Sequence, residues 1–226
     1  MNNVETSSWT LSSFFSRVYA VMALGVGLSA AVAFITIQFF PENLLNLGGG
    51  VLIGIWVVEM ILVVSLTKSA AKNSAFALPG FLFYSAVNGF VLSYTLAFYP
   101  GTIVAQAFIT AAAMFAGLAV VGVKTKKDLS GLGRAMYAAL FGLIIAGIVS
   151  MFFPANGLLG IGLSVIGVVI FSGLIAYDNQ MIIRGYQQSN GQVTEGLAIL
   201  MGLRLYLDFI NLFLSLLRIF GILGRD

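Results

Sequence analysis

Long apolar runs recur along almost the whole of this chain, and they constrain its fold more than any other feature of the sequence. A helix needs about 20 apolar residues to cross the hydrocarbon core of a bilayer. Runs of about that length or longer occupy residues 14–39, 48–66, 76–98, 103–123, 133–153, 158–178 and 196–222. Charged residues make up only 8% of the chain, whereas they make up about a quarter of a soluble domain. The sequence therefore predicts an all-α membrane protein in which seven transmembrane helices form a single polytopic membrane domain over residues 1–226.

The basic side chains predict how these spans are oriented. Eight of the eleven Lys and Arg residues stand at the start of the first span or in the expected loops 67–77, 124–134 and 179–195; they are Arg17, Lys68, Lys72, Lys124, Lys126, Lys127, Arg134 and Arg184. The turns on the other side, at Pro41, Pro100 and Pro154, hold none. Because cytoplasmic loops carry an excess of Lys and Arg, we expect a cytoplasmic N-terminus with residues 1–13 as a short tail. Seven complete spans would place the C-terminus outside, whereas a re-entrant last segment would return it to the cytoplasm.

Histidine and cysteine are both absent from the chain. Their absence excludes disulfides, thiolate metal sites and the Ser–His and HExxH classes of intramembrane protease. Histidine is also the side chain that ordinarily titrates between pH 5 and 8, so proton chemistry near neutrality has to fall to carboxyl groups. No phosphate-binding loop appears, and the basic segment "KTKKD" at 124–128 is explained by orientation and by contact with lipid headgroups. We therefore expect no nucleic-acid partner.

Three acids stand in or at the end of apolar spans. Glu59 lies well inside the second span, Asp178 closes the sixth at its cytoplasmic end, and Asp208 lies about twelve residues into the seventh. An ionised acid at mid-membrane costs on the order of 2.5–3.5 kcal/mol on insertion scales, and a basic partner, a water-filled cavity or protonation relieves that cost. The three acids are therefore candidate functional residues and candidate cation ligands. The structural alternatives are an interfacial cap for Asp178 and a neutral interhelical tie for Glu59.

A polar stripe follows one face of the last span. Its members recur at helical spacing, and they are Arg204, Asp208, Asn211, Ser215 and Arg218. Lipid cannot satisfy such a stripe, so we expect it to face protein or water. Arg204 stands four residues before Asp208, where the two side chains can pair.

The two aspartates acquire a new property if the fold brings them together. Two carboxyl groups in contact cannot both ionise cheaply, so they share one proton. Such a pair can titrate near neutral pH and would supply the proton sensor that the missing histidines cannot. We expect Asp178 and Asp208 to form this pair.

Three segments resemble the transmembrane Bax inhibitor motif family in its bacterial branch. They are "AYDNQMI" at 176–182, "LYLDFINLFLSLLRIFG" at 205–221 and "KTKKDLSGLG" at 124–133. The resemblance implies six helices around a central C-terminal helix, in a pH-regulated calcium leak channel of the inner membrane. It implies that Asp178 and Asp208 are the pH sensor and gate, and that Glu59 lines the cation path. We expect no cofactor, with Ca²⁺ as the transported ion and H⁺ as the regulator, and we expect a monomer in the lipid bilayer.

The chain departs from the family pattern at the expected latch. Related bacterial proteins carry an arginine at the inner end of the second span, and this chain has Lys68-Ser-Ala-Ala-Lys72 there. Arg204 stands where a small residue is expected. The latch is therefore a lysine, is taken over by Arg204, or is absent.

Three other functions remain open at this stage. Paired intramembrane acids also suit a proton-coupled cation antiporter, and small residues such as Gly142 and Gly147 would allow helix contacts with a membrane protease that the protein regulates. Tyr177-Asp178 with Asp208 outlines an intramembrane aspartyl protease, but "GLRLYLD" lacks the Gly-x-Gly-Asp such enzymes need. We therefore expect no enzyme activity, and flux measurements separate a leak from an exchanger and from a regulator.

Overall fold

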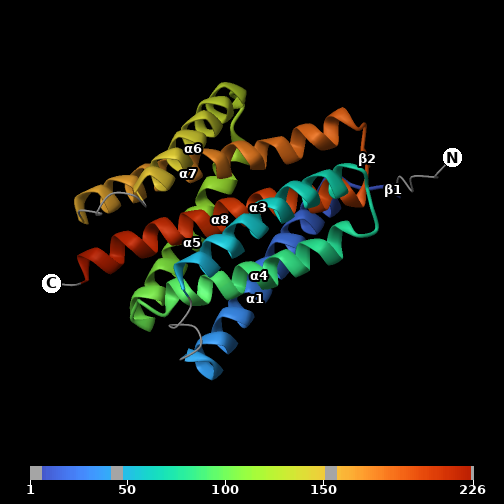
Figure 1. Ribbon diagram of the computed structural model, residues 1–226. Helices are drawn as coiled ribbons and strands as arrows, with labels where there is room; N and C mark the ends of the chain where they lie inside the picture. The colour runs from blue at the N-terminus through green and yellow to red at the C-terminus, as the bar shows by residue number, and fades with distance from the viewer. Residues whose placement is uncertain (1–6, 42–47, 151–156, 225–226) are drawn as a thin grey trace. The chain divides into compact units, whose positions relative to one another are not determined.

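The computed structural model describes residues 7–41, 48–150 and 157–224, and helices account for nearly all of them (Figure 1). The helices are α1 (Leu11–Phe39), α3 (Gly49–Ala71), α4 (Ala77–Leu96), α5 (Gly101–Lys124), α6 (Ser130–Ser150), α7 (Gly157–Gln188) and α8 (Glu195–Leu223). Within these described ranges, seven helices are long and apolar enough to cross a membrane. The prediction of an all-α membrane protein with seven transmembrane helices is confirmed.

The chain divides into two compact units. One holds the residues up to Tyr99 together with Gly185–Tyr206, and the other holds Pro100–Arg184 together with the residues from Leu207 onward. Both α7 and α8 contribute residues to each unit. The two units are described separately below, and the single membrane domain stays a prediction.

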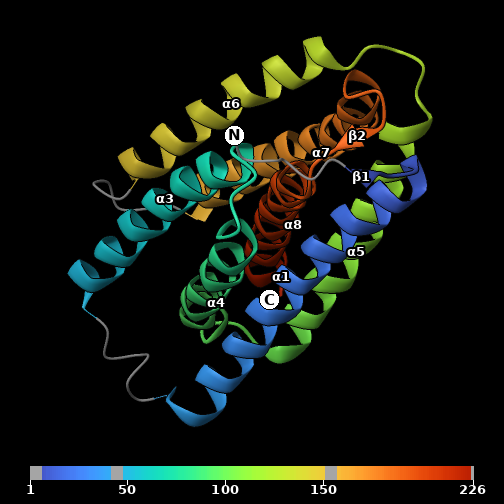
Figure 2. The same cartoon turned by 90° about the vertical axis from the view of Figure 1, so that its right-hand side faces the viewer.

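In the first unit, α1 and α3 pack against α4 (Figure 2). The contact between α1 and α4 is close because Gly89 has no side chain: a Cβ there would lie 2.6 Å from the backbone oxygen of Ser29. The first part of α8 approaches α1 in the same way, since a Cβ on Gly202 would lie 2.7 Å from Val21 Cγ1. A short antiparallel pair links β1 (Ser7–Ser8) with β2 (Gln192–Val193).

The second unit contains α5, α6, most of α7 and the remainder of α8. Gly173 of α7 lets α6 approach, since a Cβ there would lie 2.7 Å from Met136 Cγ. Gly167 of α7 meets α8, since its Cβ would lie 2.6 Å from Ser215 Oγ. Edge-to-face aromatic contacts join α5 to α8, and they involve Phe108, Phe115, Phe209 and Phe213.

Burial differs sharply among the helices. In the most apolar window of α8, 67% of the residues are buried, compared with 6% for α6. The exposed side chains of α6 include large apolar ones such as Phe141 and Ile145. In a membrane-spanning helix such side chains suit contact with lipid, whereas α8 packs against protein along most of its length.

The sixth span does not end where the sequence placed it. The expected boundary at 178 is wrong, because α7 continues ten residues further to Gln188, and Arg184 therefore lies on a helix and not in a loop. The polar segment after Asp178 contains no proline, and the helix stops only before Asn190 and Gly191, whose φ angles are 48° and 76°.

Smaller boundary differences affect other basic residues. Lys68, Lys124 and Arg134 also lie within helices. The end of the expected fifth span at 151–153, the turn at Pro154 and the first six residues of the expected tail lie outside the described residues.

Candidate functional site

Asp178 lies in the interior of α7, where two neighbouring helices approach it closely. Its side chain is buried, with 1% exposed. A Cβ on Gly122 of α5 would lie 2.2 Å from the carbonyl oxygen of Ala176, and one on Gly133 of α6 would lie 2.6 Å from the ring of Tyr177. Glycines on two helices therefore allow their backbones to pack closely against the turn of α7 that carries Asp178.

Tyr137 of α6 is a polar neighbour of Asp178. Its hydroxyl lies 3.4 Å from Oδ1 and 3.3 Å from Oδ2 of Asp178, and it donates toward the carboxyl group. The ring of Tyr137 also makes an edge-to-face contact with Tyr177. This residue was not predicted from the sequence, although a signal existed: Tyr137 stands four positions after Gly133 and therefore on the same face of α6.

Asp208 is the second buried acid of this unit, with 5% of its surface exposed. The contact between Gly167 and Ser215 marks a point where α7 and α8 meet, and the two helices run antiparallel (Figure 1). The positions of Asp178 and Asp208 along the helices can therefore be compared from this point. Asp178 lies eleven residues beyond Gly167, roughly 16 Å along the helix, and Asp208 lies seven residues before Ser215, roughly 10 Å. The two acids therefore lie within about one and a half helical turns of the same level on helices that touch. The shared proton stays a prediction.

Burial varies along the polar stripe of α8. Asn211 Nδ2 donates to the carbonyl oxygen of Leu207 at 2.8 Å, and Ser215 Oγ donates to that of Asn211 at 2.8 Å. Arg204 is half-buried and Arg218 is exposed. Backbone carbonyl groups of the helix itself therefore satisfy the amide and the hydroxyl in the middle of the stripe.

Glu59 lies in the first unit and carries a polar network of its own. Its side chain is buried, with 7% exposed. Asn88 Nδ2 of α4 donates to Glu59 Oε1 at 2.9 Å, and the hydroxyl of Tyr206 donates to Asn88 Oδ1 at 2.8 Å. The same hydroxyl lies 2.7 Å from Ser29 Oγ of α1. These partners were not predicted from the sequence, where the available signal was a lone amide inside the apolar run "SAVNGFV".

The lysines considered as a latch stand at the end of α3. Lys68 belongs to its last turn, Lys72 follows directly, and both are exposed. A different ion pair joins α1 to the start of α8. Arg17 Nε donates to Glu195 Oε1 at 2.8 Å, and Arg17 Nη2 contacts the same oxygen. The latch stays a prediction.

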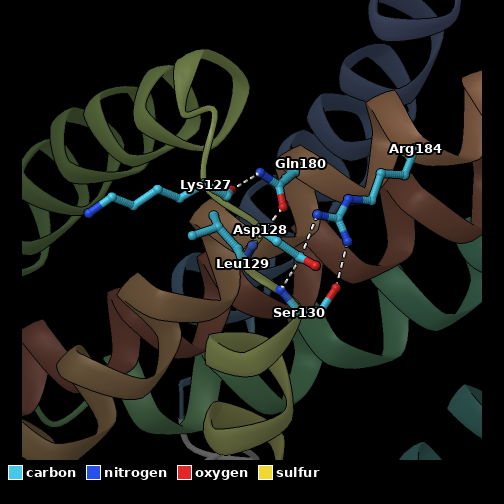
Figure 3. Close-up of polar contacts among 6 residues, drawn as sticks. All are labelled: Lys127, Asp128, Leu129, Ser130, Gln180 and Arg184. Carbon is cyan, nitrogen blue, oxygen red and sulfur yellow. Dashed lines mark hydrogen bonds and ion pairs between the residues drawn. The ribbon is translucent and has the colours of Figure 1, made fainter.

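A set of contacts fixes the loop between α5 and α6 to the extension of α7 (Figure 3). Arg184 donates to Asp128 Oδ1 and to Ser130 Oγ, both at 2.5 Å. Gln180 donates to the carbonyl oxygen of Lys127 at 2.8 Å and accepts from the N–H of Leu129 at 2.9 Å. We call these contacts the loop clamp. The clamp was not predicted from the sequence, because the polar segment that holds Arg184 predicts a loop.

The loop clamp predicts an unusually acidic Asp128. The pKa of its exposed carboxyl is lowered from 3.8 to about 2 by the Ser130 backbone N–H, then by the Arg184 guanidinium and the Ser130 hydroxyl. Because the folded pKa is the lower one, the stabilisation from this carboxylate is complete above about pH 4 and is lost as the pH falls through about 2. Carbon NMR of the carboxyl group measures the midpoint, which should move part of the way back toward 3.8 in Arg184→Gln. A wild-type midpoint near 3.8 would contradict the clamp.

The three acids predicted as cation ligands are divided between the two units. No cluster of three or more acids that could hold a metal ion occurs within residues 7–41, 48–150 and 157–224. Glu59 belongs to the first unit, whereas Asp178 and Asp208 belong to the second. Glu59 accepts a hydrogen bond from Asn88 and Asp178 accepts from Tyr137, and an incoming cation would have to replace these contacts.

Seven apolar helices with carboxyl groups buried among them define a multi-pass α-helical membrane protein. The chain belongs to the Bax inhibitor-1 family, because the family described as inhibitor of apoptosis-promoting Bax1 matches residues 11–225. The resemblance found in the segments at 124–133, 176–182 and 205–221 is therefore confirmed.

Relatives from several bacteria match over nearly their whole length. The chain is 50% identical over 230 residues to the protein YrjE of Lactococcus lactis, covering 100% of this chain and 98% of the relative. It is 50% identical over 214 residues to a membrane protein of Streptococcus pyogenes serotype M1, covering 93% of each. It is 37% identical over 216 residues to the inner membrane protein YbhL of Escherichia coli K12, covering 93% and 92%. None of these three names states an enzymatic activity.

Proposed function

We propose that this protein lets Ca²⁺ leak down its gradient across the bacterial inner membrane through a path that pH regulates. The observation that carries the proposal is the burial of three carboxyl groups, Glu59, Asp178 and Asp208, in apolar helices of a Bax inhibitor-1 family member. Burying an acid in a membrane span is expensive, and such residues mark ion or proton pathways. In this proposal the protein acts as a monomer without a cofactor. Its N-terminus is cytoplasmic, and it is not an enzyme.

Asp178 and Asp208 are the proposed gate. A single proton shared between the two carboxyl groups holds α7 and α8 together in the closed state, because two adjacent negative charges would repel each other in a medium of low dielectric constant. Loss of the proton separates the helices and opens the path. The Tyr137 hydroxyl, which lies 3.3 Å from Asp178 Oδ2, can donate to the carboxylate that remains.

Glu59 is the proposed contact for the passing ion. Ca²⁺ prefers oxygen ligands in flexible arrangements, and a carboxylate on a membrane helix supplies both charge and oxygen atoms. One carboxylate with a neutral amide neighbour, Asn88, binds a cation weakly enough to release it. Weak binding is what conduction needs.

The deciding experiment measures Ca²⁺ entry into liposomes that contain the purified protein, at a series of pH values. A leak follows the Ca²⁺ gradient alone and persists when no proton gradient exists. An exchanger stops or reverses when the proton gradient is removed or reversed, and a regulator of a membrane protease gives no flux at all. Either of the last two results would overturn the proposal.

The Glu59→Gln substitution should weaken the flux and leave its pH response intact. Glutamine keeps the size and the hydrogen bond to Asn88 but removes the charge that attracts the ion, so a loss of several-fold in the Ca²⁺ rate is expected. Glu195→Gln is the matched control, because that acid stands at the start of α8 and binds Arg17. Complete loss of pH sensing in Glu59→Gln would mean that the path and gate roles are exchanged.

A further inference from the structure

The partners of Glu59 form a continuous chain of hydrogen-bonding atoms in the first unit. The chain runs from Glu59 Oε1 to Asn88 Nδ2 at 2.9 Å and from Asn88 Oδ1 to the Tyr206 hydroxyl at 2.8 Å. It continues to Ser29 Oγ at 2.7 Å and from there to the carbonyl oxygen of Ser85 at 2.7 Å. Four helices, α3, α4, α8 and α1, each supply one side chain, so the chain is a product of tertiary structure.

The protons in this chain can be arranged in two directions. With Glu59 ionised, Ser29 donates to Tyr206, Tyr206 donates to Asn88 Oδ1, and the Asn88 amino group donates to the carboxylate. With Glu59 protonated, the carboxyl O–H donates to Asn88 Oδ1 after the amide turns over, and the amino group then donates to Tyr206. Tyr206 in turn donates to Ser29, and Ser29 donates to the Ser85 carbonyl group. An amide has one accepting and one donating end, and a hydroxyl does both, so in each arrangement one hydrogen occupies each link of the chain.

We propose that Asn88, Tyr206 and Ser29 are positioning residues that hold the Glu59 carboxyl in place in both of its protonation states. The proposal rests on the role of Glu59 in the proposed cation path. A carboxyl group on such a path meets both Ca²⁺ and protons, and a buried acid with one-directional partners would be locked in a single state. The reversible chain allows Glu59 to gain or lose a proton without leaving a buried polar group unpaired.

Packing keeps the central hydroxyl where the chain needs it. The ring of Tyr206 is fully buried and meets Phe81 and Tyr84 edge to face, at centroid distances of 5.5 and 6.0 Å. Gly25 completes the enclosure, since a Cβ there would lie 3.0 Å from Tyr206 Cδ2 and 2.4 Å from Phe81 Cζ. With the ring held in place, the hydroxyl hydrogen can still turn between two acceptors, Asn88 Oδ1 and Ser29 Oγ.

Two tyrosines are the titratable groups shown to interact with Glu59 among the described residues. The titratable side chains that interact with its carboxyl from the helices packed around it are Tyr84 of α4 and Tyr206 of α8. The polar group from α1 is Ser29. On α3 itself, the nearest charged residue is Lys68, nine positions further along the helix.

The test measures the protonation of Glu59 directly, by infrared spectroscopy of its carboxyl band during a pH titration in membranes, with Glu59→Gln assigning the band. Ser29→Ala removes the acceptor that Tyr206 needs only when Glu59 is protonated. It should therefore move the midpoint to lower pH, a fall of about three- to tenfold in proton affinity. In a Tyr206→Phe background the chain is already cut, so Ser29→Ala should then have no further effect.

The matched control is Ser93→Ala. This serine lies on the same helix as Asn88 and is fully buried, but its hydroxyl donates to the carbonyl oxygen of Phe90 in its own helix, so the midpoint should stay at the wild-type value. An unchanged midpoint in Ser29→Ala, an equal shift in Ser93→Ala, or a shift that persists with Tyr206→Phe would each overturn the proposal. The infrared result does not depend on Ca²⁺ flux, so failure of the leak and failure of the chain are separate outcomes.

Discussion

Replacing Asp208 with asparagine is expected to abolish the pH response of Ca²⁺ flux between about pH 5 and pH 8, the range that histidine ordinarily covers. The chain has no histidine, so a response in this range has to come from carboxyl groups. Asparagine keeps the shape of Asp208 but cannot take part in a shared proton with Asp178. The flux assay in liposomes should therefore give rates that no longer change with pH in this range.

The matched control for this substitution is Asp128→Asn. Asp128 lies in the loop between α5 and α6, and its pKa of about 2 keeps it ionised throughout the range tested. Removing its charge cannot remove a titration near neutrality, so this variant should keep the wild-type pH profile. If Asp208→Asn kept that profile as well, the assignment of the gate would be wrong.

Adding a single methyl group at Gly122 should destabilise the protein strongly. A Cβ there would lie 2.2 Å from the carbonyl oxygen of Ala176, 2.9 Å from its carbonyl carbon and 3.0 Å from its Cα. These atoms are backbone, so no side-chain rotation relieves the clash and α5 has to separate from α7. Overpacking of this kind costs about 1–3 kcal/mol or more, which exceeds the gain of about 0.5–1 kcal/mol that Gly→Ala gives inside a helix. Thermal unfolding in detergent measures the difference.

Gly117→Ala is the control for that experiment because it makes the same change on the same helix. A Cβ at Gly117 meets nothing within 4 Å, so only the gain in helix propensity remains and the unfolding temperature should stay or rise slightly. Equal stability of the two variants would show that α5 does not lie in close contact with the backbone of α7 at Ala176. Because Ala176 precedes Asp178 by two residues, Gly122→Ala should also disturb the gate.

The hydrophobic pattern was a reliable guide to the helices and a poor guide to the end of α7. Apolar runs of spanning length identify membrane helices because lipid demands that every backbone group be bonded within its own segment. The polar segment after Asp178 carried no such signal, since its helix is stabilised by partners elsewhere in the chain. Gln180 and Arg184 contact the loop before α6, and no local pattern predicts that.

The acids of the candidate site could be found from the sequence, but their partners could not. Glu59, Asp178 and Asp208 stand out because a carboxyl group among apolar residues is rare in a membrane span. Tyr137, Asn88 and Ser29 are ordinary minor components of such helices, and they acquire a role only through neighbours far away in the chain. Asn88 lies 29 positions from Glu59, and Ser29 lies 177 positions from Tyr206.

The sequence by itself determined that the chain has seven helices able to cross a membrane, that it belongs to this family, and that carboxyl groups stand within its apolar spans. These properties follow from composition and spacing, because the cost of placing a residue in lipid depends mainly on the residue and its depth. Tertiary structure decided which hydroxyl and amide groups surround each acid and where glycine lets two backbones touch. Hydrogen bonds and contacts of about 3 Å depend on how distant segments pack, and no local stretch of sequence predicts that geometry.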